Sequence, residues 1–373
     1  MAANPLVVGI DGRELGGRPT GTGRYLRNLL RHWREAGDTL VVYFNGPPAL
    51  DPVLDHVSIR KRPLGDGAAR GIWWQEVLLP RAARADAIDV FFSPAYSCPL
   101  RLDRPRVTAV HDLSFFAHPQ DFTWLDAARR RALVTASLHA SSVVPVCSAF
   151  TARELARLFP HLAERTVHIP LGADGDLPAP PARAEARQTL GVTGPYVLAV
   201  GAILNRRCVP ELLRALARLR ERHPGIVLDL VGDNRTHPRL DLDALVASRG
   251  LRANVRLSGF VDDEALAARY AAADVFVALS EYEGFGLPAL EAATRGVPLV
   301  VGEPPSLGEI FRDAALVVDP HDENGIALAI DHVLTEPETR VALVTAGEAL
   351  ARRHSWANTA RRTRAALARA VGR

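Results

Sequence analysis

Two glutamates separated by seven residues carry the clearest chemical signal in the chain. Glu283 and Glu291 bracket the string E-G-F-G-L-P-A-L-E, in which Gly284 and Gly286 let a ligand approach the backbone. Pro288 suits the first turn of a helix, because its missing N–H group has no partner to lose there. The free N–H groups of a helix start attract phosphate, and glutamate oxygens accept hydrogen bonds from sugar hydroxyls. The stretch therefore predicts a site for a diphosphate flanked by polyols, as in a nucleotide sugar.

A purely structural role for these glutamates is the alternative. They would then cap the helix and pair with arginines. Arginines are abundant here, since all the Lys and Arg positions except Lys61 are arginine. The complete string, followed by G-V-P, is much more specific than a pair of carboxylates and favours the binding site.

The same string resembles the E-x7-E signature of the retaining GT-B glycosyltransferases of family four. This resemblance implies that Glu283 binds hydroxyl groups of the donor sugar and that Glu291 binds the ribose. It also implies backbone contacts to the ligand from the residues between them, namely Gly284, Phe285, Gly286 and Leu287.

Two adjacent arginines follow the predicted strand 196–202. In the related family this loop usually reads P-R-K-N; here Arg206 matches, Arg207 stands in place of the lysine, and Cys208 replaces the asparagine. The resemblance implies that both arginines hold the donor diphosphate, which suits the bidentate geometry of guanidinium. Surface arginines without a ligand are the alternative. The altered loop also leaves open a non-catalytic binding protein.

Three further segments resemble the family pattern. His111 and Asp112 follow a predicted strand at 107–110, where ligands bind in parallel sheets, and the resemblance places His111 beside the donor sugar and its leaving group. A structural His–Asp pair is the alternative. A glycine-rich loop is predicted to face the transferred sugar and the acceptor, and a later turn is predicted to meet the nucleotide base. The loop residues are Gly21, Thr22 and Gly23, and the turn ends at Val261.

Apolar runs of strand length alternate with helical patterns along the whole chain, which predicts βαβ units and parallel sheets. Strands are predicted at 6–11, 39–44, 57–60, 90–92, 107–110, 143–147, 165–170, 196–202, 226–232, 255–260, 275–279 and 297–301. The principal helices are predicted at 25–36, 72–79, 151–158, 210–222, 241–249, 262–272 and from Pro288 to about Arg295. The run at 72–79 reads as core, although its tryptophans could line a groove.

A segment rich in glycine and proline at 171–183 is the best candidate linker. We therefore expect an α/β protein with two Rossmann-like domains in the GT-B arrangement and a cleft between them. The expected boundaries are 1–172 for an acceptor-side domain and 173–355 for a nucleotide-sugar-binding domain. Residues 356–373 are expected to form a helix that crosses back to the first domain.

Composition narrows the possible environment and partners. The 373 residues are 48% hydrophobic and 23% charged, as in soluble globular proteins, and a net charge of +3 does not indicate nucleic acid. Three scattered cysteines lack metal-ligand spacing, and no apolar run is long enough to span a membrane, so we expect reduced thiols and a cytoplasmic protein. Arginines 24, 27, 31 and 34 share one helix face, which would suit peripheral contact with an anionic membrane or simply solvent.

The function expected from the resemblance is retaining transfer of a sugar, in particular mannose, from a nucleotide sugar to a saccharide or lipid-linked acceptor. No metal or other cofactor is expected, because arginines and a helix start can neutralise the departing diphosphate. The Asp241-Leu-Asp243 spacing is assigned to a helix cap rather than to a metal. Another GT-B enzyme, such as a sugar-nucleotide epimerase, and an inactive nucleotide-sugar-binding subunit are the alternatives.

Overall fold

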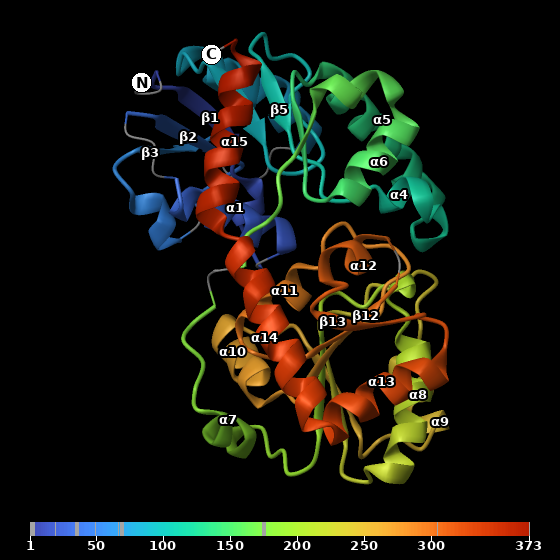
Figure 1. Ribbon diagram of the computed structural model, residues 1–373. Coiled ribbons are helices and arrows are strands. Elements are labelled where there is room, and N and C mark those ends of the chain that lie inside the picture. Colours follow the sequence, from blue (N-terminus) through green and yellow to red (C-terminus); the bar gives the residue numbers. More distant parts are fainter. Residues whose placement is uncertain are drawn as a thin grey trace. The chain divides into compact units, whose positions relative to one another are not determined.

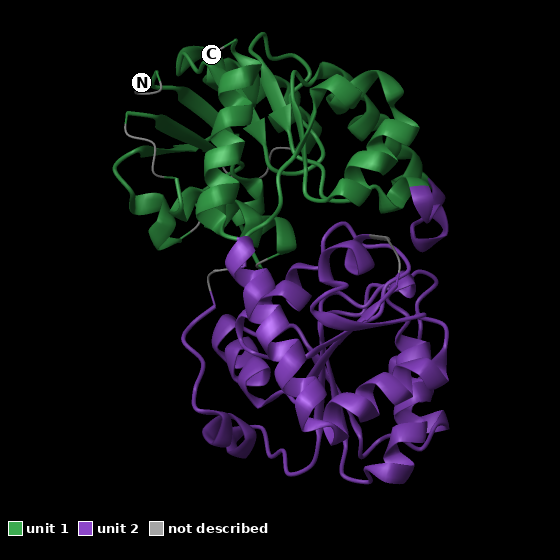
Figure 2. Cartoon of the chain, in the orientation of Figure 1, with its two compact units in different colours: residues 1–116, 125–172, 355–373 green, residues 117–124, 173–354 purple. Residues whose placement is uncertain are grey.

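The computed structural model describes residues 4–18, 20–33, 37–48, 50–65, 67, 71–173, 177–303 and 305–372. The chain divides into two compact units (Figures 1 and 2). Unit 1 comprises residues 1–116, 125–172 and 355–373, and unit 2 comprises 117–124 and 173–354. The segment 117–124, which the sequence places in the first domain, groups with unit 2 because His118 and Asp121 contact Glu281 and Arg206 there.

A parallel five-stranded sheet forms the centre of unit 1, in the order β3-β2-β1-β4-β5. Its strands are β1 (Val7–Asp11), β2 (Thr39–Phe44), β3 (Ile59–Pro63), β4 (Val90–Ser93) and β5 (Arg106–Thr108). Two short parallel strands, β6 (Val144–Val146) and β7 (Thr166–His168), continue from β5 through bridges at Val143 and Val146. All these strands lie where the apolar runs predict them, and none of their ends is shifted by more than three residues.

The helices of unit 1 differ from the prediction at two places. They are α1 (Gly21–Arg31), α2 (Gly71–Trp73), the π-helix η3 (Trp74–Leu78), α3 (Leu79–Ala85), α4 (Ser114–Ala117), α5 (Trp124–Ala140), α6 (Ala149–Leu158) and α15 (Trp356–Ala370). The glycine-rich loop is shorter than predicted, because the Thr20 hydroxyl accepts a hydrogen bond from the Gly23 N–H group at 2.9 Å and starts α1 four residues early. The run at 72–79 is only partly core: Trp74 is fully buried, but Ile72 and Trp73 are exposed.

The C-terminal helix α15 packs on α1, β4 and β5 of unit 1, as the fold prediction requires. Arg364 and Asp38 form a buried ion pair, with the Arg364 Nε atom 3.2 Å from Asp38 Oδ2. Trp356 is 1% exposed, and a Cβ atom on Gly172 would lie 2.3 Å from its backbone nitrogen. This close approach explains why a glycine stands at the end of the first unit.

Unit 2 contains a parallel six-stranded sheet in the order β10-β9-β8-β11-β12-β13. Its strands are β8 (Tyr196–Val200), β9 (Val227–Val231), β10 (Val255–Gly259), β11 (Val275–Ala278), β12 (Leu299–Gly302) and β13 (Ala315–Val318). The strand β13 was not predicted. Alternation of these strands with helices gives the Rossmann-like pattern that the sequence indicates.

The helices of unit 2 surround this sheet and pack on one another in pairs, α8 on α13, α7 on α10 and α11 on α14. Their bounds are α7 (Arg183–Thr189), α8 (Val209–Arg222), α9 (Leu242–Ser248), α10 (Asp263–Ala272), α11 (Leu287–Thr294), α12 (Pro305–Phe311), α13 (Glu323–Thr335) and α14 (Pro337–Arg353). Among the described residues of the whole chain, helices with the length and hydropathy to cross a bilayer are absent.

Candidate active site

The strand order of unit 2 fixes where a ligand can bind. β8 and β11 are neighbours, but the chain continues from β8 to β9 on one side and returns to β11 on the other. In open parallel sheets the ligand crevice lies at the carboxyl ends of the strands at such a reversal. The two loops that leave these ends contain Arg206 and Arg207 after β8, and Glu283 after β11. The predicted phosphate-binding and sugar-binding residues therefore meet at one edge of the sheet.

Arg206 and Arg207 lie on a single 3-10 turn, η6 (Asn205–Arg207), and each faces a carboxylate. The Arg206 side chain is 10% exposed, with its guanidinium 3.4 Å from the Asp121 carboxylate. The Arg207 guanidinium lies 2.9 Å from the Glu283 carboxylate, and both side chains are about one-fifth exposed, 21% and 20%. Arg206 is therefore not the solvated surface arginine of the alternative interpretation. Sequence reasoning did not identify Asp121 as its partner, since 85 residues separate the two.

The loop between the two glutamates has the form that the sequence predicts. Gly286 has a φ of +87°, and a Cβ atom there would lie 2.5 Å from Leu307. Pro288 is in the first turn of α11, and the N-cap residue is Gly286, which has no side chain with which to cap the helix start. Gly284 and Phe285 are buried, and Leu287 is half-buried. The N–H groups of the first turn of α11 therefore directly follow a buried glycine turn. They lie beside the Arg207–Glu283 pair.

Glu291 lies one turn inside α11 and is 9% exposed. One of its carboxylate oxygens accepts a hydrogen bond of 3.1 Å from the hydroxyl of the buried Tyr270. This contact holds the carboxylate in one orientation. A carboxylate fixed in this way can accept hydrogen bonds from the hydroxyls of a ligand through its remaining lone pairs.

Two other predicted positions of unit 2 lie near the carboxyl edge of the sheet. Val261 follows β10, the strand at the edge, and is half-buried. A cavity of about 550 Å³ lies next to β9 and β10, with Gly259 and Asp241 in its wall. Asp241 is the N-cap of α9, accepting a hydrogen bond of 2.9 Å from the Ala244 N–H group, so the helix-cap assignment of this aspartate is confirmed.

His111 of unit 1 follows β5 and is held as a neutral imidazole. Its Nε2 atom lies 2.7 Å from the Pro94 carbonyl, and its ring packs edge-on to Tyr25 at 4.8 Å. Burial lowers its pKa below the ordinary value. A carbonyl can only accept, so Nε2 carries the proton and Nδ1 keeps a lone pair. Asp112 accepts hydrogen bonds from the backbone and hydroxyl of Ser114, at 3.0 and 2.8 Å, and its negative charge partly opposes the lowering of the His111 pKa.

Gly21, Thr22 and Gly23 belong to the first turn of α1 rather than to a loop. Gly23 is buried, and its Cβ would lie 2.4 Å from the Glu14 carbonyl, which leaves Gly21 and Thr22 as the more accessible members. Arg27 on the same helix forms an ion pair of 2.6 Å with Asp51, so the predicted basic face is partly neutralised. Arg34 lies outside the described residues.

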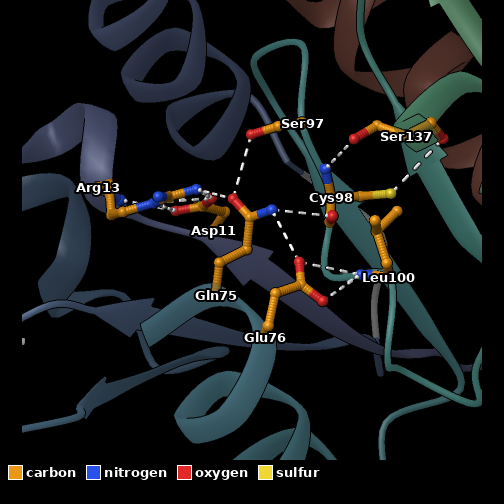
Figure 3. A network of polar contacts seen from close by, with 8 residues as sticks. All are labelled: Asp11, Arg13, Gln75, Glu76, Ser97, Cys98, Leu100 and Ser137. Atoms are coloured by element: carbon orange, nitrogen blue, oxygen red, sulfur yellow. Dashed lines mark hydrogen bonds and ion pairs between the residues drawn. The ribbon is translucent and has the colours of Figure 1, made fainter. Parts of the chain in front are cut away.

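Unit 1 has its own strand reversal, between β1 and β4, and a cavity of about 610 Å³ lies there. Asp11 at the end of β1 binds Arg13, whose guanidinium also donates to Gln75 at 2.9 Å (Figure 3). Gln75 donates to the Cys98 carbonyl, and Glu76 accepts from the backbone of Leu100. Other residues of the wall include Glu14, Tyr96, Arg101, Phe115, Asp126, Arg129 and Arg130.

Sequence reasoning missed this network. Asp11 could have been found as a polar residue that ends the first strand, where ligand-binding side chains gather. Gln75 and Glu76 gave no signal, because they sit inside an apolar run. A π-helix at Trp74–Leu78 turns them toward the cavity, and such helices often mark functional sites.

The fold is that of the GT-B glycosyltransferases. The Anabaena protein Alr3699/HepE, solved in complex with UDP and glucose, matches with a TM-score of 0.77 over 96% of this chain and 98% of that one, at 20% sequence identity. At that level of identity the likeness establishes the fold alone.

The sequence comparisons establish the family. The profile described as "Glycosyltransferase Family 4" matches residues 19–177, and that described as "Glycosyl transferases group 1" matches 183–350. The O-antigen chain mannosyltransferase B of Escherichia coli is 34% identical over 92% of this chain and 94% of its own length. A GDP-mannose-dependent alpha-(1-6)-phosphatidylinositol monomannoside mannosyltransferase of Mycolicibacterium smegmatis is 32% identical, over 56% of each chain. The chain belongs to the family-four glycosyltransferases.

Proposed function

We propose that the protein transfers mannose from a nucleotide-activated donor to a saccharide or lipid-linked acceptor in polysaccharide or glycolipid assembly, with retention at the anomeric carbon. The observation that carries the proposal is the arrangement of Arg206, Arg207 and Glu283 beside the start of α11, where the N-cap residue is a glycine. Cationic groups there suit a diphosphate, and a carboxylate next to them suits hydroxyl groups of the attached sugar. Two of the relatives are mannosyltransferases, which supports mannose as the transferred sugar.

In this proposal Arg206 and Arg207 bind the diphosphate, Glu283 binds the donor sugar and Glu291 binds the ribose. Backbone groups from Gly284 to Leu287 and the turn at Val261 complete donor binding. His111, as a neutral imidazole, is assigned to the donor sugar near its leaving group. The chemistry is then transfer on one face of the sugar, with the leaving phosphate taking the proton of the acceptor hydroxyl, and the protein supplies positioning and charge stabilisation.

Transfer is proposed to need no divalent cation on the donor, because the two guanidinium groups supply the positive charge that Mg²⁺ or Mn²⁺ would otherwise contribute. Activity after EDTA treatment is the test. Full loss of activity that manganese restores would overturn this assignment.

The cavity between β1 and β4 of unit 1 is proposed to receive the acceptor. Its wall includes four arginines and four carboxylates, and both ionic and apolar surfaces face it. Charge balance of this kind suits an uncharged saccharide portion better than a diphosphate. Gly21, Thr22, Gly23 and Asp112 are proposed as neighbours of the acceptor and the transferred sugar.

Peripheral contact with an anionic membrane would bring the protein to a lipid-linked acceptor. Because Arg27 is paired with Asp51, only part of the basic face of α1 can contribute. Sedimentation with anionic vesicles at low and high salt tests the idea, and absence of pelleting at low salt would end it.

A thermal-shift panel with GDP, UDP, ADP and dTDP identifies the nucleotide, since a ligand that binds the folded state raises its melting temperature. Turnover of the corresponding labelled nucleotide mannose with a panel of mannosides follows, with the anomeric configuration of the product read by NMR. An inverted product would refute retention. Nucleotide binding without turnover of any donor would favour the inactive binding subunit.

A further inference from the structure

A thiol, an imidazole and a carboxylate from three separate loops converge in unit 2. Cys208, Glu281 and His321 each place one ligand atom within 4.8 Å of the ligand atoms of the other two. Cys208 immediately precedes α8, Glu281 lies in the loop after β11, and His321 lies in the loop after β13. Since 113 positions separate Cys208 from His321, their spacing in the sequence carries no metal-ligand pattern.

The surroundings of Cys208 favour a cation. The thiol is buried, and the Glu281 carboxylate of the same cluster is only 35% exposed, so a metal ion bound between them would neutralise a partly desolvated negative charge. His321 Nε2 already lies 3.0 Å from Glu281 Oε1, and the other oxygen of that carboxylate lies 3.9 Å from His118 Nδ1.

Cys208 lies at the junction of η6 and α8, where the backbone turns sharply. Its φ and ψ are +51° and +39°, a left-handed conformation that is costly for a residue with a Cβ atom. Such conformations cluster at ligand clamps and active sites, where the surrounding structure imposes them. Here the strained residue is also the buried thiol of the cluster.

We propose that Cys208, Glu281 and His321 bind one Zn²⁺ ion. Sulfur, imidazole nitrogen and carboxylate oxygen are the donors that zinc prefers, whereas Mg²⁺ and Ca²⁺ prefer oxygen alone. Ligand atoms that share a tetrahedral zinc ion lie roughly 3.3–3.8 Å apart, given bonds of about 2.0–2.3 Å. The half-exposed His321 side chain can move to close the remaining distance. Water would fill the fourth position, and binding would release the thiol proton to solvent.

The ion would connect the loop that carries Arg206 and Arg207 to the ends of β11 and β13. A hydrogen bond of 2.8 Å from the Glu281 N–H group to the Arg206 carbonyl already joins two of these segments. A zinc ion there would hold in place the loop that we propose to bind the donor diphosphate.

Titration of the metal-stripped full chain with Co²⁺, which reports thiolate ligation by a charge-transfer absorption band, tests the proposal. We expect saturation at one Co²⁺ per chain and loss of the band when Zn²⁺ is added. Cys208→Ser should abolish the band. Loss of a residue that only hydrogen-bonds to a metal ligand costs roughly 10- to 100-fold in metal affinity. Because His321 is proposed as a ligand itself, His321→Ala should weaken Co²⁺ binding by more than that.

Cys98→Ser and His332→Ala are matched controls, because Cys98 is another buried free thiol and His332 another histidine of unit 2. Both should bind Co²⁺ like the wild type. Zn²⁺ should raise the melting temperature of the wild type and both controls, but not that of His321→Ala. A wild type without a band, or a band that survives Cys208→Ser, would overturn the proposal. Neither result would decide whether the protein transfers a sugar, because turnover of the labelled donor tests that separately.

Discussion

Both sheets have a strand reversal at which we propose that a ligand binds, but different side chains line the two reversals. In each sheet, the first strand of the unit lies beside the strand at which the connections reverse, β1 beside β4 and β8 beside β11. At the first edge, Arg13 is bound to Asp11 and Gln75 in the wall of a cavity of about 610 Å³. At the second edge, Arg206 and Arg207 flank a glycine turn and the start of α11. Topology therefore selects the place, and the side chains at that place select the ligand.

The largest expected effect is a loss of stability in unit 1 that does not involve binding by unit 2. Arg364→Ala leaves the buried Asp38 carboxylate without its cation, which should lower the free energy of unfolding of unit 1 by about 3–5 kcal/mol. Tryptophan fluorescence in urea measures this, because Trp33, Trp73, Trp74 and Trp356 all belong to unit 1. Arg361→Ala, an exposed change on the same helix, is the control. Equal loss in both variants would contradict the role of the ion pair.

Loss of one diphosphate contact comes next. Arg206→Ala should weaken nucleoside diphosphate binding by about 1.5–3 kcal/mol, or roughly 10- to 150-fold, because a charge-assisted contact is removed. Isothermal titration measures it, with Arg218→Ala on the exposed face of α8 as control. Since Asp121 is left buried without its partner, Arg206→Ala should be compared with the double change Arg206→Ala/Asp121→Asn. Unaltered affinity in both would place the diphosphate elsewhere.

Substitution of the two glutamates of the motif should change different kinetic constants. Each change should be roughly tenfold, which corresponds to a lost contact of about 1.4 kcal/mol. Glu291→Ala should mainly raise the donor KM, since the ribose contact is the same in ground and transition states. Glu283→Ala should lower kcat more than it raises KM, since the sugar gains charge during transfer. Nucleoside diphosphate affinity should drop only in Glu291→Ala. An equal drop in Glu283→Ala would reverse these assignments.

A substitution in the cavity wall of unit 1 should have a smaller effect than the substitutions in unit 2. Arg13→Ala removes neutral and ionic contacts from the cavity wall, and we expect the acceptor KM to rise roughly 2- to 12-fold, for about 0.5–1.5 kcal/mol, with nucleoside diphosphate affinity unchanged. Steady-state kinetics at saturating donor measures this, and Arg84→Ala, on α3, is the control. A selective change in donor KM would show that the two edges do not divide donor and acceptor as proposed.

The smallest expected effect is a dependence of stability on pH. One histidine in each unit should cause it. Burial lowers the pKa of His111 and His354 below their ordinary value of 6.5, so the folded protein holds them neutral while the unfolded chain binds protons. The free energy of unfolding should therefore be constant above that value and fall as the pH drops below it. Urea unfolding of the wild type, His111→Gln and His354→Gln above and below this pH measures how much each histidine contributes to the pH dependence. A slope that neither variant reduces would contradict the assignment.

Much of the fold and half of the site follow from the sequence alone. Apolar periodicity gives the strands, because a strand buried on both faces must be apolar throughout, and the glycine turn with Pro288 gives the start of α11. The E-x7-E string and the adjacent arginines point to the loops that we propose to bind the donor. They can do so because contacts to a diphosphate and to hydroxyls require particular residue types at short range along the chain.

Only the tertiary structure decides which distant residues share a site. Asp121 reaches Arg206 across 85 positions, Gln75 reaches Arg13 across 62, and His321 comes within a few ångströms of Cys208. Local patterns cannot predict such pairs, because the spatial order of strands, and not their order in the sequence, decides which loops meet at the edge of a parallel sheet. The sequence by itself thus determined the family, every strand except β13, and the residue types of the loops that we propose to bind the donor. Packing decided what each of these charged groups faces.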